Sequence, residues 1–289
     1  MAGKNTKRRG SRLKLLGTGA LVGLLLAAFL IFWFFFRDTA PPEVGSAESA
    51  DAVAASIAEA AEQETTGADP AQTAPLEVES DTEVDVGQPD SAASVGAPTD
   101  GIWTVDTSFG PFDESCITEA CGATFVGFRI NEVLARFGAK TVVGRTGNVT
   151  GSLELQGTQV TAASFVVDME SMQTDDPART TALKGESGGL ETLKFPEAIF
   201  VLAEPIELGE LPAEGAAIDA MAVGDLTVHG VTQRVNIPLT AEMQAGVIIV
   251  SGNLEGMQLA DYDIPKPQAI VVVSVEDTAI MELQLFFSR

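Results

Sequence analysis

The feature that most constrains the fold is an alternation of apolar and polar side chains in the C-terminal part of the chain. Over residues 231–243 most odd positions are apolar, including Val235, Ile237 and Leu239, and most even positions are polar. The same period of two returns near residues 153–155, 165–169 and 281–287. A period of two predicts β-strands with one buried and one solvated face, as in antiparallel sheets.

Turn signals join these segments at short intervals. They are Gln156-Gly157, His229-Gly230, Ala245-Gly246 and Glu276-Asp277, and each separates two apolar runs as a hairpin would. Within the folded part we expect helix only over residues 131–137 and 177–194; before it, the Ala- and Glu-rich residues 46–65 could form a transient helix. The pattern predicts an all-β fold of eight to nine strands with short helices, either a sandwich or a barrel, and closure into a barrel would remove exposed edges. A barrel of this size can be packed solid or can hold one small ligand.

The N-terminus carries a membrane signal. Residues 15–36 contain no charge, and 22 residues are enough to cross a bilayer as one transmembrane helix. Residues 1–14 hold six basic residues and only Arg37 follows the span, which predicts a cytoplasmic tail and an extracytoplasmic remainder. Aromatic residues crowd the far end of the span, so we expect an uncleaved anchor rather than a signal peptide. The motif Gly19-x-x-x-Gly23 permits weak dimerisation.

Charge separates the rest of the chain into two parts. Residues 37–99 contain fourteen acids, few large apolar side chains and no base after Arg37, and this composition predicts a disordered acidic linker. Residues 100–289 form the predicted barrel domain. The net charge of the whole chain is −24, and an acidic domain repels phosphate backbones, so nucleic-acid binding is excluded.

The two cysteines of the chain are Cys116 and Cys121. Both lie on the predicted external side, where a disulfide is the expected state of such a pair. The spacing lacks the further ligands of a metal site, and we expect neither a metal nor a cofactor.

Several motifs together resemble one family. Trp103-Thr-Val-Asp106 opens the domain, a segment Asp168–Asp176 precedes Arg179 and Phe195-Pro196, and Thr227-Val-His-Gly-Val-Thr232 follows. Their order is similar to that of the YceI-like family of bacterial secreted and periplasmic proteins. The resemblance implies a lipocalin-like barrel of eight strands with a polyisoprenoid or an isoprenoid quinone in its tunnel.

The chain departs from the family pattern in three places. Asn131 and Glu132 stand where members usually carry a histidine on the first strand. Residues 110–123, with both cysteines, form an apparent insertion. The late Arg-x-x-Phe-Gly segment is represented only by residues 260–264.

Lipid binding requires a dry tube of inward-facing apolar side chains. The expected ligand-binding residues share the apolar parity of their strands: Phe165, Val167, Met169, Phe200, Val235, Ile237, Leu239, Val247, Ile249, Leu283 and Leu285. The expected partners are an isoprenoid lipid or quinone and, through the N-terminal helix, the bacterial cell membrane.

Two other interpretations stay open. A solidly packed barrel would be a surface interaction module for a protein or for the cell wall. An enzyme acting on the lipid is disfavoured, because the single histidine, His229, lacks a nucleophile at catalytic spacing and fits a turn. Asp175-Asp176 fits a helix cap before Pro177 better than a calcium site.

Overall fold

A computed structural model describes residues 40–66 and 99–289. Its α-helices are α2 (Ala47–Thr66), α3 (Ser115–Thr118) and α4 (Pro177–Leu183), and three short 3-10 turns are η1 (Met169–Ser171), η2 (Glu186–Gly188) and η3 (Leu259–Tyr262). The strands are β1 (Gly101–Asp106), β2 (Phe125–Leu134), β3 (Gly138–Thr146), β4 (Val149–Gln156), β5 (Gln159–Asp168), β6 (Gln173–Thr174), β7 (Glu197–Leu202), β8 (Ile206–Glu207), β9 (Ala217–Val228), β10 (Val231–Gln244), β11 (Val247–Gln258), β12 (Val272–Val275) and β13 (Thr278–Ser288).

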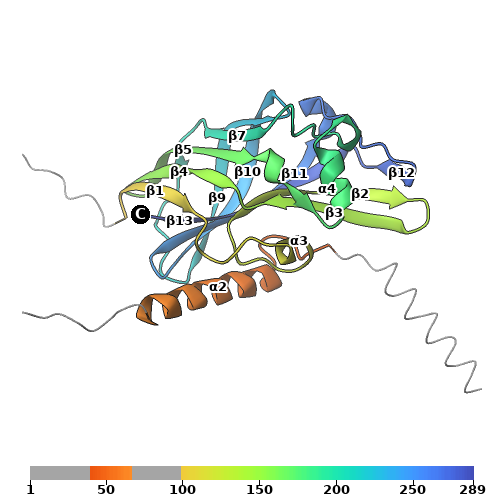
Figure 1. The fold of residues 1–289 in the computed structure, drawn as a ribbon. Coiled ribbons are helices and arrows are strands. Elements are labelled where there is room, and N and C mark those ends of the chain that lie inside the picture. The colour runs from red at the N-terminus through yellow and green to blue at the C-terminus, as the bar shows by residue number, and fades with distance from the viewer. Residues whose placement is uncertain (1–39, 67–98) are drawn as a thin grey trace, which may run out of the picture.

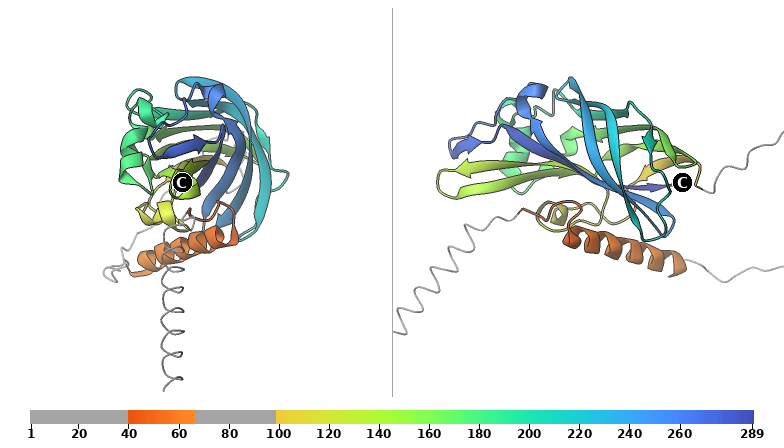
Figure 2. Two further views of the ribbon diagram at one scale, coloured as in Figure 1. Left: turned by 90° about the vertical axis from the view of Figure 1, so that its right-hand side faces the viewer. Right: turned by 180° about the vertical axis from the view of Figure 1, so that it is seen from behind.

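Eight antiparallel strands close into a barrel in the order β1-β4-β5-β7-β9-β10-β11-β13, with β13 returning to β1 (Figures 1 and 2). The expected eight-stranded antiparallel barrel is therefore confirmed. Strand β13 divides its pairing, because Phe286–Ser288 pair with β1 whereas Ile280–Gln284 pair with β2. Strands β2 and β3 then extend the wall beyond β1, and β12 pairs with the end of β2.

The expected hairpin turns are mostly confirmed. His229 and Gly230 adopt positive φ angles of 53° and 76° between β9 and β10, and Ala245 and Gly246 do the same between β10 and β11. Positive φ at both central residues matches the twist of a two-residue hairpin. Glu276-Asp277 does not close a hairpin, since β12 and β13 both pair with β2 rather than with each other.

The two helix predictions differ in outcome. Helix α4 begins at Pro177 as expected, and Asp176 caps it by accepting a hydrogen bond of 2.7 Å from the Ala178 amide. It ends at Leu183 rather than at residue 194, and the short turn η2 follows before Gly189 at positive φ. The helix expected over residues 131–137 is wrong. Those residues complete β2 and turn into β3, because the ladder with residues 138–141 satisfies their backbone groups.

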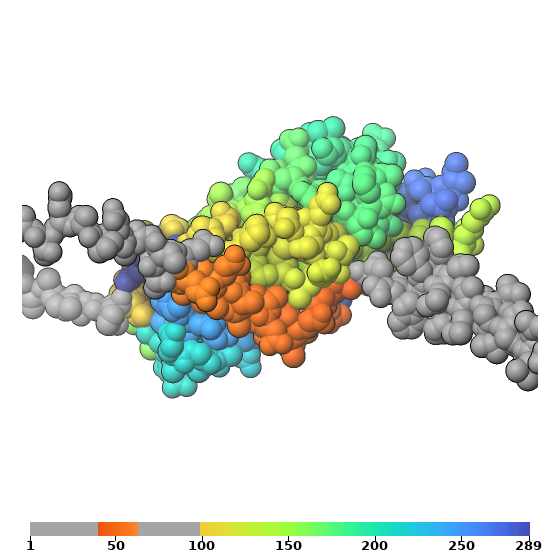
Figure 3. All heavy atoms as spheres, turned by 60° about the horizontal axis from the view of Figure 1, so that its bottom comes forward, coloured from red at the N-terminus to blue at the C-terminus, as the bar shows by residue number. Residues whose placement is uncertain are grey.

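The prediction of a disordered linker over residues 37–99 is wrong for residues 40–66. This segment lies along the outside of the barrel as an extended start followed by α2 (Figure 3). The apolar stripe of α2 is thin, but Ile57 is 4% exposed and packs with Val247, Ile249 and Phe286 of the barrel. Ordering this segment costs conformational entropy, and its own composition offers little apolar surface to offset that cost. The apolar patch on the barrel strands supplies the missing burial.

A loop with the disulfide lies beside this segment (Figure 3). Cys116 and Cys121 are bonded, with sulfurs 2.07 Å apart, which confirms the expected bridge. Gly122 permits close contact with α2, because a Cβ there would lie 2.4 Å from the carbonyl oxygen of Ala52. We call residues 40–66 the strap and residues 107–124 the disulfide loop.

Buried charges fix the strap and the loop to the strands. Glu282 of β13 accepts hydrogen bonds from Arg129 at 2.7 Å and from Arg145 at 2.6 Å, and all three side chains are at most 6% exposed. Arg129 also donates to the carbonyl oxygens of Pro41 and Pro42, at 2.8 and 2.7 Å. Arg145 donates to the Cys116 carbonyl oxygen at 2.6 Å. The charges are thus paired and hydrogen-bonded, as buried charges must be.

The described residues contain no helix long and apolar enough to cross a membrane. The predicted tail (residues 1–14), the predicted transmembrane helix (residues 15–36) and residues 67–98 of the predicted linker lie outside the described residues.

Candidate lipid-binding cavity

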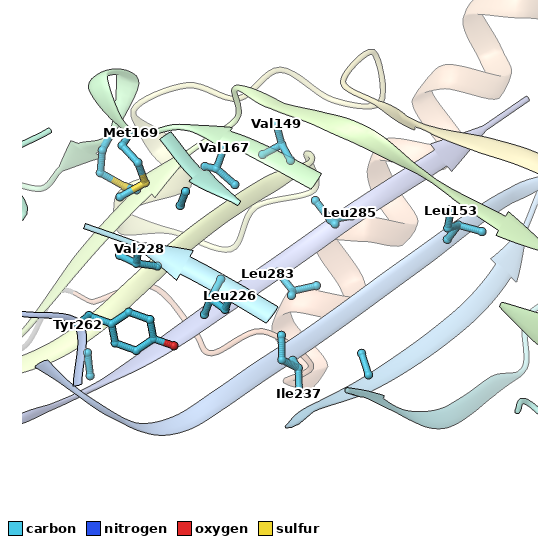
Figure 4. Close-up of a cluster of buried hydrophobic side chains, with 14 of the residues drawn as sticks. Val149, Leu153, Val167, Met169, Leu226, Val228, Ile237, Tyr262, Leu283 and Leu285 are labelled. Atoms are coloured by element: carbon cyan, nitrogen blue, oxygen red, sulfur yellow. The ribbon is translucent and has the colours of Figure 1, made fainter. Parts of the chain in front are cut away.

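The barrel encloses a cavity of about 520 Å³. Its wall is built from alternate residues of the strands, and Figure 4 shows Val167 of β5, Leu226 of β9 and Leu283 of β13 around a common interior. Ligand pockets in proteins occupy roughly 300–1,000 Å³. The side chains of this barrel therefore leave room for a small ligand.

The structure places most of the predicted binding residues in the wall. Those that line the cavity are Phe165, Val167, Met169, Phe200, Ile237, Leu239, Leu283 and Leu285. Alternation identified the inward face correctly for the seven that lie on strands, whereas Met169 follows β5 in the turn η1. Contact with a ligand stays a prediction for each of them.

Three predicted residues do not line the cavity. Val247 and Ile249 point outward and pack under α2 with Phe286. Residues 247–250 are all apolar, so alternation could not show which of them face the interior of the barrel. Pairing settles it: Ile249 lies opposite Phe286, and Val250 lies opposite Leu285. Val235 is half-buried against the core and is not a wall residue.

Sequence reasoning missed several wall residues. On β11 the inward residues are Ile248 and Val250 rather than Val247 and Ile249. On β9, Leu226 and Val228 line the cavity. Phe287 continues the alternation that contains Leu283 and Leu285, so that parity could have identified it. The wall residues of β11 required knowledge of the register with β13.

The cavity reaches the surface at the end of the barrel formed by the β2–β3 hairpin, β12 and α4. Phe137 and Val271 line the cavity and are also 40% and 55% exposed. We call this opening the mouth. Lining residues that carry charge are Glu132, Asp176 and Arg179, and all three lie at this end.

The charged groups at the mouth are already paired. Arg179 extends from α4 and donates to Glu132 at 2.6 Å and to Asp175 on its own segment. Asp176 caps the same helix. Three carboxylates and one guanidinium therefore surround the mouth.

His229 forms a structural contact between loops. Its Nε2 lies 2.9 Å from a carboxylate oxygen of Glu191, and its Nδ1 lies 3.2 Å from the carbonyl oxygen of Tyr262. The hydrogen bond from His229 lowers the pKa of Glu191 despite partial desolvation. Burial raises the pKa of Tyr262, whose hydroxyl has no hydrogen-bond partner among the described residues. The ring of Phe195 lies 4.0 Å from that of His229, so the site fits the expected turn role.

The region covered by the structure holds no cluster of three or more His, Cys, Asp or Glu side chains suited to a metal ion. The disulfide engages both cysteines.

The YceI-like domain model matches residues 120–287 of this chain. The chain belongs to the YceI-like family. The match covers the barrel from β2 to β13 and leaves the strap, β1 and most of the disulfide loop outside. No curated protein shows significant similarity to the chain.

Three solved structures are similar to this chain. A polyisoprenoid binding domain from Saccharophagus degradans, implicated in plant cell wall breakdown, is 17% identical, with a TM-score of 0.48, covering 64% of this chain and 97% of that one. Burkholderia cenocepacia BcnA is 14% identical, with a TM-score of 0.43 and coverage of 56% and 95%. A Campylobacter jejuni YCEI protein is 14% identical, with a TM-score of 0.41 and coverage of 50% and 82%.

Proposed function

We propose that the barrel binds an isoprenoid-type lipid or quinone in its cavity, on the outer side of the cytoplasmic membrane. The observation that carries the proposal is the cavity itself, which is apolar along its length and charged only at the mouth. Removing apolar surface from water is worth about 25 cal/mol per Å². A hydrocarbon chain can therefore bind without a specific hydrogen bond.

The cavity weighs against the solidly packed alternative. A surface interaction module would need no interior space, yet the wall residues of β5, β9 and β13 leave about 520 Å³ between them. Binding is also favoured over catalysis. His229 is held by Glu191 and by the Tyr262 backbone and does not line the cavity.

The charges at the mouth favour an uncharged head group. Arg179 is engaged by Glu132 and by Asp175, and Asp176 lies beside them. A phosphate would bring a further anion to three carboxylates and one guanidinium, and like charges at short range repel. An alcohol or a quinone carbonyl avoids this cost.

A binding titration tests both parts of the proposal. Geranylgeraniol and geranylgeranyl monophosphate share one hydrocarbon chain and differ in head-group charge. We expect the alcohol to bind at least tenfold more tightly, and Glu132→Gln to narrow the difference. Tighter binding of the phosphate would contradict the neutral head group and leave the cavity's role intact.

A variant that fills the cavity provides the control. Ala222 of β9 is 3% exposed and lines the cavity opposite Ile237. Ala222→Phe places a ring in the empty space, so we expect at least a tenfold loss of affinity for geranylgeraniol with the fold retained. If neither prenyl compound binds the natural protein, or if Ala222→Phe binds as well as it does, lipid binding in the cavity is refuted.

A further inference from the structure

The end of the barrel that carries the mouth also exposes an apolar surface. Its members are contributed by the β2–β3 hairpin and by the segment that contains β12: Val133, Phe137, Ile270, Val271 and Val273. Ile270 is fully exposed, Val273 is 65% exposed and Val271 is 55% exposed. We call these five residues the rim. Single exposed apolar residues are ordinary, but a contiguous group of them marks an interaction surface.

The rim is one continuous surface rather than scattered side chains. Val272 and Ser274 of β12 pair with Leu134 and Val133 of β2, and the Ala135 amide donates to the Val271 carbonyl oxygen at 2.9 Å. Phe137 and Val271 belong both to the rim and to the cavity wall. A hydrocarbon chain that leaves the cavity at the mouth therefore meets the rim directly.

The strap restricts how far the barrel can lie from the predicted membrane span. That span ends at Phe36, and the chain is fixed to the barrel at Pro41, whose carbonyl oxygen accepts from Arg129. Five residues of fully extended chain reach at most about 17 Å. The sequence alone suggested a spacer of some 60 residues, but the ordered strap shortens the tether to a few.

The strap also determines which end of the barrel is held close. Arg129 and Val133 lie on the same strand, four residues apart, which at about 3.3 Å per residue is about 13 Å. Figures 1 and 2 show the strap beginning near the end that carries β12 and the β2–β3 hairpin, with α2 running toward the opposite end. The short tether thus leaves from the same end as the mouth.

Charge is consistent with a bilayer as the occupant. The domain is acidic overall, yet the β2–β3 hairpin carries the basic residues Arg136 and Lys140 next to Val133 and Phe137. These two cations can contact the phosphate groups of a bilayer surface. The carboxylates Glu132, Asp175 and Asp176 lie at the mouth of the same end, so the apolar rim and the short tether carry the docking more than charge does.

We propose that the rim docks on the lipid bilayer in which the N-terminal span is anchored, so that the cavity opens directly onto the membrane. This inference goes beyond lipid binding, because the docking does not require an occupied cavity. It depends on the predicted span and on the observed strap.

Fluorescence of the full-length protein in bilayers tests the proposal. Ile270→Cys in the rim and Ile102→Cys in β1 form a matched pair, since both isoleucines are exposed (104% and 63%). Ile270 directly precedes β12, and β12 and β1 lie at opposite ends of the barrel (Figure 1). The native cysteines are buried in a disulfide, so a polarity-sensitive fluorophore can be attached selectively to the new thiol. The vesicles contain phosphatidylglycerol and phosphatidylcholine, with or without a lipid that carries a quenching spin label.

We expect the probe at position 270 to lose at least half of its emission to the spin-labelled lipid, and the probe at position 102 to lose less than a tenth. Equal quenching at both positions, or none at position 270, would overturn the docking. Failure of the full chain to insert into the vesicles would overturn it as well, because the tether would then be absent. None of these three outcomes bears on the prenol titration, so the two proposals can fail separately.

A second variant separates docking from binding and rests on the proposed lipid function. Val273→Asp adds a charge to the exposed rim, outside the cavity wall. We expect uptake of geranylgeraniol from vesicles to slow at least fivefold, while affinity for the same alcohol presented in detergent stays unchanged. An unchanged uptake rate would contradict the role of the rim.

Discussion

The two faces of β13 show how differently one strand can be buried. Its inward side chains Leu283, Leu285 and Phe287 border the cavity. Its outward side chains Glu282, Gln284 and Phe286 are at most 1% exposed, beneath the strap and the disulfide loop. Both faces are removed from water, but only the inner one adjoins empty space.

The outer face is closed by specific polar contacts. Gln284 donates to the carbonyl oxygens of Cys121 and Ala123 at 2.8 and 2.9 Å, and Glu282 accepts from two arginines. The inner face has no such contacts and depends on shape alone. The comparison teaches that the outer face fixes one arrangement of the chain, whereas the inner face leaves room for an occupant.

The largest effect is expected where the outer face holds charge. Glu282→Ala leaves Arg129 and Arg145 buried without their carboxylate, and breaking a buried ion pair in this way costs about 3–5 kcal/mol. Denaturant unfolding measures the loss. Asp225→Ala, which removes the partner of Arg234 in an exposed ion pair, is the control and should cost about 0–1 kcal/mol. If both variants lost a similar free energy of unfolding, the buried ion pairs of the outer face would contribute no more than an exposed one.

Two neighbouring isoleucines test the faces of β11 directly. Ile249 packs under α2 and Ile248 lines the cavity, with exposures of 6% and 7%. Ile249→Ala should lower the free energy of unfolding by about 2–4 kcal/mol, because it opens a void in a packed contact. Ile248→Ala should cost less, because that side chain already borders empty space.

The same pair should behave in the opposite way in a binding assay. Ile248→Ala changes the cavity wall and should alter the affinity for geranylgeraniol several-fold, whereas Ile249→Ala should leave it within a factor of two. An affinity change confined to Ile249→Ala would show that the assignment of the faces is wrong.

Removing the disulfide should have a moderate effect on the outer face. The Cys116–Cys121 bridge closes a loop with a sequence separation of 5, and the chain-entropy model assigns about 2 kcal/mol to a loop of this size. Cys116→Ser with Cys121→Ser should therefore lower the free energy of unfolding by about that amount and leave prenol affinity unchanged. A loss of binding would link the loop to the cavity.

The smallest expected effect is on the pH dependence of stability, through the contact between Glu191 and His229. The hydrogen bond from His229 lowers the pKa of Glu191 below its ordinary value of 4.5. The folded state then binds this proton less tightly than the unfolded state, so the contribution is complete above pH 4.5 and is lost as pH falls through the lowered pKa. Glu191→Gln should therefore lose less stability as pH falls below 4.5 in unfolding experiments. An unchanged pH profile would show that the contact contributes nothing in solution.

Alternation and turns were enough to predict antiparallel strands, because a strand with one wet face records its orientation in its own sequence, and the family resemblance added the closed barrel. Strand β10 is such a case, and Ile237 and Leu239 were assigned to the cavity correctly. Strand β11 is the opposite case. Val247–Val250 is apolar on both sides, since α2 covers one face and the cavity borders the other.

The strap could not be predicted from its composition. Its apolar stripe on α2 is thin, and several of its contacts are made by the backbone carbonyl groups of Pro41, Pro42 and Val44, which accept from Arg129 and Asn253. Carbonyl groups are the same in every sequence, so their partners become visible only when the distant strands are in place. The sequence did contain one clue to the covering segment. Charged side chains within apolar strands must be paired when buried, and Arg129, Arg145 and Glu282 are such residues.

The most direct test of the account is the chemical identity of what the cavity holds. The full-length protein and its Ala222→Phe variant are purified in the same mild detergent, extracted with organic solvent and analysed by mass spectrometry. We predict about one uncharged isoprenoid per natural protein and at least a tenfold depletion of it in the variant, with equal amounts of phospholipid in both. Identical extracts from the two proteins, without an isoprenoid, would contradict the claim that this barrel is hollow in order to bind a lipid.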